Sequence, residues 1–173
     1  HGVVGNNGSG KTVMFKCICG FLQPTAGTVH VDGKQIGVDV DFPPDIGIII
    51  ESPGFLPQLP GLKNLEILAG LKRKIGLKEV ADTIRQVGLD PLSTKPVGKY
   101  SLGMRQRLGI AQAIMERPSL LILDEPMNGL DKYGVAEMRA LFRSLATDGR
   151  TILLASHNIQ DIEELCDTVC EMD

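Results

Sequence analysis

The sequence predicts an α/β fold, in which a mostly parallel sheet is flanked by helices and interrupted by a helical insert. Short apolar runs alternate with segments of helical periodicity near both ends of the 173 residues. Between these ends the alternation stops, and a proline-rich loop is followed by helical patterns alone. Strands that alternate with helices pair in parallel, so we expect one sheet assembled from both ends of the chain, with the insert as a lobe.

The first elements each end at a glycine or at an Asp-Gly turn. We expect, in chain order, a buried strand at Val3–Val4, a helix at Lys11–Cys19, a strand at Thr28–Val31 and a strand at Ile46–Glu51. The last of these is rich in β-branched residues, which is typical of a strand buried on both faces.

The insert reads as helical throughout. We expect helices at Leu62–Ala69, ended by Gly70, at Lys78–Val87, ended by Gly88, and from the N-cap Ser101 to about Glu116. The sequence therefore divides into a core of residues 1–51 and 117–173 and an inserted helical subdomain of residues 52–116.

The remainder of the core returns to alternation. We expect a buried strand at Leu120–Leu123, a helix with the apolar stripe Met138, Leu141, Phe142 and Leu145, a strand at Thr151–Ala155, a short helix at Asn158–Cys166 and the start of a strand at Thr168–Glu171.

Net charge and the length of the apolar stretches argue against nucleic acid binding and against a membrane-spanning segment. Eighteen basic against 21 acidic residues give a net charge of −3, whereas proteins that grip a nucleic acid backbone normally carry a basic excess. The longest apolar stretches are far shorter than the ~20 residues needed to span a bilayer. We expect a soluble domain of the cytoplasmic kind that does not bind nucleic acid, with four reduced cysteines packed as small apolar groups.

A complete phosphate-loop pattern, GNNGSGKT, stands between the first strand and the first helix. Its members, all expected to bind nucleotide, are Gly5, Asn6, Asn7, Gly8, Ser9, Gly10, Lys11 and Thr12. Glycines let successive N–H groups curl around phosphate oxygens, and the helix that follows adds the positive end of its dipole. Lys11 would reach the β- and γ-phosphates, and the Thr12 hydroxyl would ligate Mg²⁺.

Two adjacent carboxylates end the strand LLILDE. Asp124 is expected beside Mg²⁺, and Glu125 is expected on the γ-phosphate side, where a general base or a water-orienting group belongs. An acidic pair after a strand is more often a solvated turn or a helix cap, but a phosphate loop upstream in an α/β pattern favours the catalytic interpretation.

Three further motifs resemble those of the ABC ATPase family, the nucleotide-binding subunits of ABC transporters. SLGMRQR at Ser101–Arg107 looks like its signature motif, Asn128–Asp131 resembles its D-loop, and His157 matches its switch histidine. Together with the phosphate loop and the acidic strand these motifs occur in family order, so the resemblance covers nearly the whole chain and implies a P-loop NTPase fold.

The resemblance implies ATP hydrolysis with Mg²⁺ in a head-to-tail dimer that sandwiches two ATP molecules. Each site would take its phosphate loop from one chain and its signature helix from the other, so Ser101, Gly103 and Asp131 are expected to bind the partner's nucleotide. Catalysis is expected from Glu125, Lys11 and His157. The family's membrane-embedded permease would contact residues 52–99 and hold the subunit at the inner face of the membrane.

The sequence departs from the family pattern in two motifs. The family usually has Gln after the strand that leads into the insert, where Glu51 stands here, and Leu102 stands where a signature Gly is common. We expect Glu51 to be a metal-linked switch residue, with a plain strand-end carboxylate as the alternative. Glu51 and SLGMRQR together resemble the subgroup that exports bacitracin- and lantibiotic-type antimicrobial peptides.

Two other functions stay open at this stage. One is a non-transport ATPase of the same fold, although the interval from Lys11 to Asp124 is too short for the long coiled coil that such enzymes usually carry. The other is a nucleotide-binding or dimerising module without turnover, which remains an alternative for a shortened chain.

Our first prediction concerns nucleotide affinity. Family members carry an antiparallel β-subdomain with an adenine-stacking aromatic before the phosphate loop, whereas four residues precede Gly5 here. We expect that this subdomain is largely missing, that the chain is truncated at both ends and that its ATPase activity is weak or absent. Because stacking is worth about 1–3 kcal/mol per base, affinity should fall ~5- to 150-fold with little preference for ATP over GTP. Tight, adenine-selective binding in a fluorescence titration would contradict this.

Overall fold

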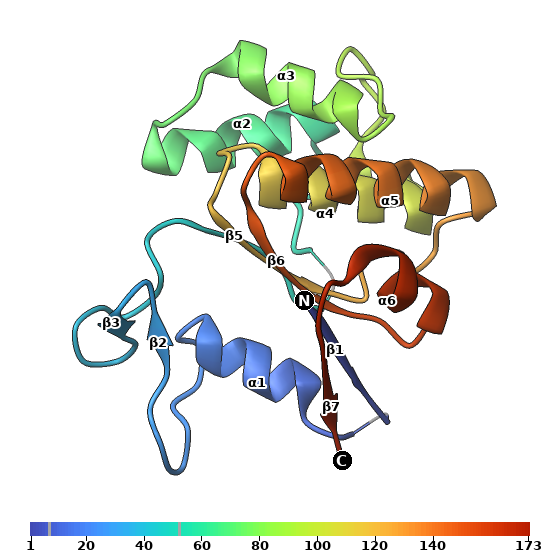
Figure 1. Ribbon diagram of the computed structural model, residues 1–173. Coiled ribbons are helices and arrows are strands. Elements are labelled where there is room, and N and C mark those ends of the chain that lie inside the picture. Colours follow the sequence, from blue (N-terminus) through green and yellow to red (C-terminus); the bar gives the residue numbers. More distant parts are fainter. Residues whose placement is uncertain (7, 52) are drawn as a thin grey trace.

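The computed structural model describes residues 1–6, 8–51 and 53–173. A five-stranded sheet runs through its centre in the order β4-β5-β6-β1-β7 (Figure 1). Its strands are β1 (Gly2–Gly5), β4 (Ile46–Ile49), β5 (Leu120–Asp124), β6 (Thr151–Ala155) and β7 (Val169–Met172). All four neighbouring pairs are parallel, so the expected α/β fold with a mostly parallel sheet is confirmed.

Helices cover both faces of this sheet. Figure 1 shows α1 (Lys11–Ile18) on one side, and on the other α4 (Leu102–Ile114), α5 (Lys132–Thr147) and α6 (Ile159–Leu165). Alternate residues of β5 point to the two opposite faces of the sheet. Ile122 packs in the cluster with Phe15 of α1, whereas Leu121 and Leu123 pack in the larger cluster with α4 and α5. This period of two is what a pleated strand imposes.

The position of a strand in the sheet decides how deeply it is buried. Residues Leu121, Ile122 and Leu123 of β5 are fully buried, as the sequence predicted, because β5 lies between two neighbours. The prediction for Ile46–Glu51 was wrong in one respect, because β4 is the edge strand: Ile46 and Ile48 remain half-buried there. Apolar composition alone does not distinguish an edge strand from a central one.

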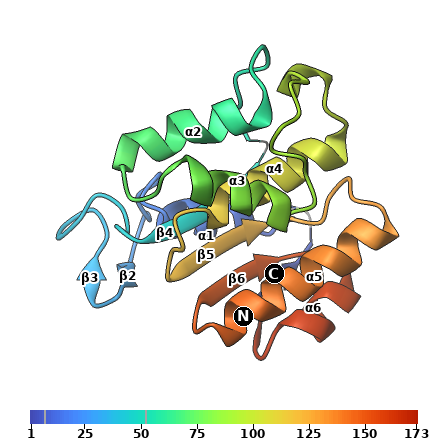
Figure 2. The ribbon, with the colours of Figure 1, turned by 90° about the horizontal axis from the view of Figure 1, so that it is seen from above.

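The first part of the predicted insert forms a helical layer above α4, which is the last helix of that insert (Figures 1 and 2). It contains α2 (Gly61–Lys72), α3 (Leu77–Gln86) and a 3₁₀ turn at Val97–Lys99, and α3 packs on α4. The predicted stop at Gly70 was wrong: α2 continues to Lys72 and ends where Arg73 adopts a left-handed φ of 54°. Ser52, the first residue of the predicted subdomain, lies outside the described residues, and the division into subdomains stays a prediction. No helix in the described ranges is both long and apolar enough to cross a membrane.

The strand predicted at Thr28–Val31 is confirmed in its second half, where it forms one arm of a small hairpin. Its strands β2 (His30–Val31) and β3 (Lys34–Gln35) are antiparallel and joined by Asp32-Gly33. Both turn residues have positive φ, 50° and 75°, which is the geometry of a two-residue turn that matches strand twist.

Burial decides the chemistry of the cysteines. All four lie in the described ranges and are free thiols. Cys19 is buried beside Phe15 and Val3, and that burial raises its pKa to about 11; burial also raises the pKa of Cys166. A thiol with a raised pKa stays neutral at pH 7, so Cys19 acts as a small apolar group.

Our second prediction tests the contact between α4 and the edge strand. A Cβ at Gly47 of β4 would lie 2.0 Å from the backbone oxygen of Ala113, which a flexible side chain cannot relieve. Gly47→Ala should therefore lower the free energy of unfolding by about 1–3 kcal/mol. Gly70→Ala is the matched control, since a Cβ at this exposed helical position meets nothing within 4 Å, and it should raise stability by roughly 0.5–1 kcal/mol. Equal urea midpoints for the two variants would refute the close approach.

Candidate functional site

The parallel sheet brings four loops to one edge. The phosphate loop follows β1, Glu51 follows β4, Asp124 and Glu125 end β5, and His157 follows β6. In open α/β sheets ligands bind outside the carboxyl ends of the strands, which is the edge where these residues meet. The predicted site residues of the core therefore gather from segments that are up to 150 residues apart.

The phosphate loop owes its shape to two glycines in the left-handed region. Gly8 has φ 89° and Gly10 has φ 95°, and Gly10 is also the N-cap of α1. A side chain would strain both positions, because L-residues rarely adopt this conformation. Asn7, which the sequence also assigned to this loop, lies outside the described residues.

The donors of this loop are suited to an anion. The Ser9 hydroxyl is buried and has no hydrogen-bond partner within the described part of the chain. Lys11 Nζ donates to the backbone oxygens of Gly5 and Asn6 at 2.8 and 3.0 Å. These bonds hold the positively charged ammonium group of Lys11 against the loop. An orphaned buried hydroxyl, a lysine and the first N–H groups of α1 together fit a phosphate group.

Thr12 and Asp124 face each other across the loop. The Thr12 hydroxyl donates to Asp124 Oδ2 at 2.6 Å and joins the first turn of α1 to the end of β5. Mg²⁺ in such sites usually takes one or two protein oxygens and completes its shell with phosphate oxygens and water. This hydroxyl–carboxylate pair supplies that kind of ligand, although the described residues contain no group of three or more His, Cys, Asp and Glu side chains around one point.

Glu125 and His157 form the second pair of the site. Oε2 of Glu125 and Nδ1 of His157 lie 2.8 Å apart, at hydrogen-bond distance. Which of the two atoms donates depends on the tautomer of the ring, and the contact leaves Nε2 as the ring nitrogen that does not face Glu125. Glu125 adopts a left-handed φ of 51°, and its N–H donates to Ala155 at 2.9 Å, which ties the end of β5 to the residues before His157.

Glu51 lies at the same edge but is occupied elsewhere. Its carboxylate pairs with Lys16 Nζ at 2.6 Å, and its backbone has a left-handed φ of 63°. No hydrogen bond recorded among the described residues joins Glu51 to Thr12 or Asp124. Its expected role at the metal therefore stays a prediction, and Lys16 is a partner that the sequence did not reveal.

Ser101, Gly103 and Asp131 make their contacts with α4, α5 and the segment between β5 and α5. Ser101 caps α4 by accepting from Met104 N at 3.2 Å, and Asp131 caps α5 by accepting from Gly134 N at 2.8 Å. A Cβ at Gly103 would lie 2.9 Å from the backbone oxygen of Gly129, so the signature helix packs against the segment before α5. Within the described residues no hydrogen bond links these three to the loop.

Sequence reasoning also missed Gln106 and Arg139. Gln106 Nε2 donates to the backbone oxygen of Pro126 at 2.9 Å, which ties the signature helix to the residue after Glu125. Arg139 is buried against α6. It precedes Phe142 of the apolar stripe by three residues, and this spacing could have indicated that Arg139 lies on the buried face of the helix. A charged residue on a buried face requires a partner.

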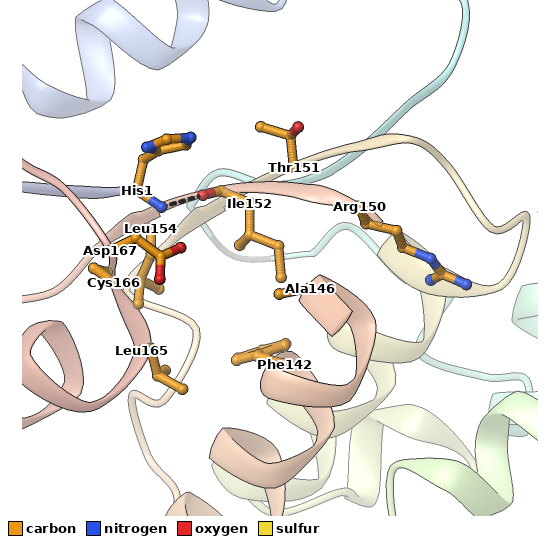
Figure 3. A pocket seen from close by; sticks show the side chains of 10 residues that line it. All are labelled: His1, Phe142, Ala146, Arg150, Thr151, Ile152, Leu154, Leu165, Cys166 and Asp167. Atoms are coloured by element: carbon orange, nitrogen blue, oxygen red, sulfur yellow. Dashed lines mark hydrogen bonds between the residues drawn. The ribbon is translucent and has the colours of Figure 1, made fainter. Parts of the chain in front are cut away.

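Two cavities flank the sheet at opposite ends of the strands. A cavity of about 620 Å³ opens at the carboxyl ends and is lined by Gly5, Asn6, Ser156 and His157 together with residues of α6 and β7. A second cavity, of about 120 Å³, lies at the amino ends between His1, Phe142 and Leu165 (Figure 3). There the backbone nitrogen of His1 donates to Ile152 O, and none of the predicted site residues lines this cavity.

Known proteins resemble this chain along nearly its whole length. The ABC transporter family matches residues 1–128. YybJ of Bacillus subtilis, an uncharacterised ABC transporter ATP-binding protein, is 42% identical over 99% of this chain and 79% of its own length. The bacitracin transport ATP-binding protein BcrA of Enterococcus faecalis is 42% identical over 98% of the chain and 56% of its own length. The lantibiotic transport ATP-binding protein SrtF of Streptococcus pyogenes is 35% identical, and the chain covers 72% of it.

Solved structures share the fold. The ATP-binding cassette MJ0796, in a dimeric post-hydrolysis state bound to ADP and Pi, superimposes with a TM-score of 0.86 at 22% identity. The match covers 99% of this chain and 80% of that chain. This likeness confirms the predicted P-loop fold with its helical insert.

Our third prediction concerns the loop lysine. Lys11→Met should lower the affinity for a nucleoside triphosphate about 10- to 150-fold, because it removes charge-assisted hydrogen bonds worth about 1.5–3 kcal/mol. Thermal stability should change little, since the side-chain hydrogen bonds of Lys11 within residues 1–6, 8–51 and 53–173 go to carbonyls of its own loop. Lys78→Met, at an exposed position of α3, is the matched control and should bind as the parent does. Equal affinities of the two variants in a fluorescence titration would exclude Lys11 from the binding site.

Proposed function

Because this chain belongs to the ABC transporter family of ATP-binding proteins, we propose that it binds and hydrolyses ATP as the nucleotide-binding subunit of a transporter. The observation that carries this proposal is the convergence, at one sheet edge, of an orphaned phosphate-loop hydroxyl, the Thr12–Asp124 pair and the Glu125–His157 pair. Each of the three supports a different requirement of phosphoryl transfer.

The phosphate loop would bind the triphosphate. Lys11 would exchange its two bonds to loop carbonyls for phosphate oxygens, and Ser9 would gain the partner it lacks. Both changes favour binding, since a charge-assisted hydrogen bond is stronger than the neutral one it replaces. Thr12 and Asp124 would hold Mg²⁺, which supplies neutralisation of the charge on the phosphate oxygens.

Glu125 and His157 would act at the terminal phosphate. Glu125 is half-buried at the end of β5 and would accept a proton from, or orient, the attacking water. His157 would contact the γ-phosphate from the same side, because its bond to Glu125 fixes the plane of the ring. The pair therefore links water activation to recognition of the terminal phosphate.

A second subunit would complete the site. Ser101 and Asp131 cap α4 and α5, Gly103 lies against Gly129, and no hydrogen bond among the described residues joins the three to the phosphate loop of their own chain. A head-to-tail partner, identical or related, would bring its own copies of these residues to this loop, with the N-terminus of its α4 directed at the γ-phosphate. The dimeric post-hydrolysis state of MJ0796 is consistent with such an assembly.

The transported substrate would be an antimicrobial peptide or a related antibiotic. Relatives named for bacitracin and lantibiotic transport support this class. The permease would dock on residues 52–99 of the insert, where Leu56 is exposed, and would hold the subunit at the cytoplasmic face of the membrane. In this arrangement the core of residues 1–51 and 117–173 would bind ATP. The subdomain of residues 52–116 would transmit the nucleotide state of the core to the permease.

Our fourth prediction tests the role of Glu125. In the chain extended at both ends, Glu125→Gln keeps the size and the polarity of the side chain but cannot accept a proton, so ATP turnover should fall about 10²- to 10⁴-fold. ATP binding should persist, and a dimer trapped with ATP should appear on size exclusion. Glu163→Gln, at an exposed position of α6, is the control and should retain activity.

The outcomes separate the competing functions. Normal hydrolysis by Glu125→Gln would exclude Glu125 as the base. A parent protein that binds ATP, dimerises and never hydrolyses it would instead be the regulatory module without turnover.

A further inference from the structure

A buried ion pair joins α5 to α6 behind the candidate site. Arg139 Nε donates to Asp161 Oδ1 at 2.8 Å, and Arg139 Nη1 donates to Glu164 Oε1 at 2.9 Å. Asp161 is 1% exposed and Arg139 8% exposed. Taking two charges out of water is costly unless every remaining hydrogen-bonding position is satisfied, so the second oxygen of Asp161 must also be used.

That second oxygen reaches the loop that carries His157. Ser156 Oγ donates to Asp161 Oδ2 at 2.9 Å, and the same Oγ accepts from the backbone N–H of Asn158 at 3.1 Å. Ser156 is itself buried. Asp161 therefore fixes the residue before His157 directly and the residue after it through one hydroxyl.

The His157 ring has little else to hold it. Its side chain is 69% exposed, and among the described residues its ring is hydrogen-bonded to Glu125 alone. An exposed side chain is free to change rotamer unless its backbone is fixed and its partner is close. The orientation of this ring therefore depends on the conformation of residues 156–158, which the buried ion pair controls.

We propose that Asp161 and Ser156, with Arg139 behind them, are positioning residues that hold the His157 loop so that the ring contacts Glu125. The contribution to hydrolysis rests on the function proposed above, whereas the effect on the ring does not. None of the three touches the reacting atoms; they act through the backbone on either side of His157.

Ser156→Ala is the variant that isolates this connection. It removes one hydroxyl and leaves the Arg139–Asp161 pair in place, so the protein should fold. Losing this link should lower kcat about tenfold, the equivalent of one hydrogen bond, while KM for ATP stays within about twofold. Ser156→Thr restores a hydroxyl and should restore kcat.

The control is Arg143→Met. Arg143 lies one turn beyond Arg139 on the same helix and also pairs with α6, through Glu164 at 2.9 Å, but it makes no recorded bond to Asp161 or Ser156. A general loosening of the α5–α6 contact would affect both variants alike. The proposed connection predicts a change in Ser156→Ala alone.

The direct readout is ¹⁵N NMR of the His157 ring, assigned with His157→Gln and compared with Glu125→Gln. In Ser156→Ala the Nδ1 resonance should move toward its position in Glu125→Gln, and in Arg143→Met it should match the parent. If Ser156→Ala does not fold, Arg139→Met combined with Asp161→Leu removes both buried charges at once and should show the same displacement.

Two results would overturn the proposal. One is a parent-like ring resonance in Ser156→Ala, whatever its kcat; the other is an equal displacement in Ser156→Ala and Arg143→Met. Because the resonance is measured without turnover, a parent protein that fails to hydrolyse ATP would refute the proposed function and leave this test intact.

Discussion

The parallel register of β5 with β6 is the constraint on which the site depends. Asp124 pairs with Ala155, the last residue of β6, so the end of β5 lies beside the residues that lead to His157. The buried side chains Leu121, Ile122 and Leu123 fix this register, because a slip of one residue would turn each of them to the opposite face. The same register places the Asp124 carboxylate within hydrogen-bond distance of Thr12 on α1. Packing of apolar side chains thus determines where the polar ones meet.

The site carries polar groups whose partners are replaceable. Lys11 bonds to carbonyls of its own loop, Ser9 has an unused hydroxyl, and Thr12 and Asp124 bond to each other. These groups make few hydrogen bonds, or bonds within the site alone. A triphosphate with its cation can therefore replace these bonds at a small cost in free energy. Deeper in the molecule the polar network of Arg139, Asp161 and Ser156 is fully paired. The buried network thus stabilises the fold, whereas the polar groups of the site are available to bind a ligand.

The departures from the family pattern have local structural explanations. Glu51 introduces a negative charge at the edge of the site, and Lys16 on α1 neutralises it at 2.6 Å. Leu102, in place of a common signature glycine, packs against Gly129, where an added Cβ would lie 2.4 Å from the leucine side chain. Each unusual residue is therefore accommodated by a neighbour from a segment distant in the sequence. Such a neighbour cannot be found from local spacing.

The sequence by itself determined the fold class, most helices and strands, and the residues at the candidate site. Hydrophobic periodicity, glycine positions and the order of the motifs depend on the local chain, so β6, α1 and the cap Ser101 agree with the structure to within a residue. Only the tertiary structure decided that β4 is an edge strand, that α2 passes through Gly70, and that Glu51 pairs with Lys16. It alone revealed the buried link from Arg139 to the His157 loop. These features depend on contacts between segments far apart in the chain. Local patterns in a single sequence do not indicate which distant segments become neighbours.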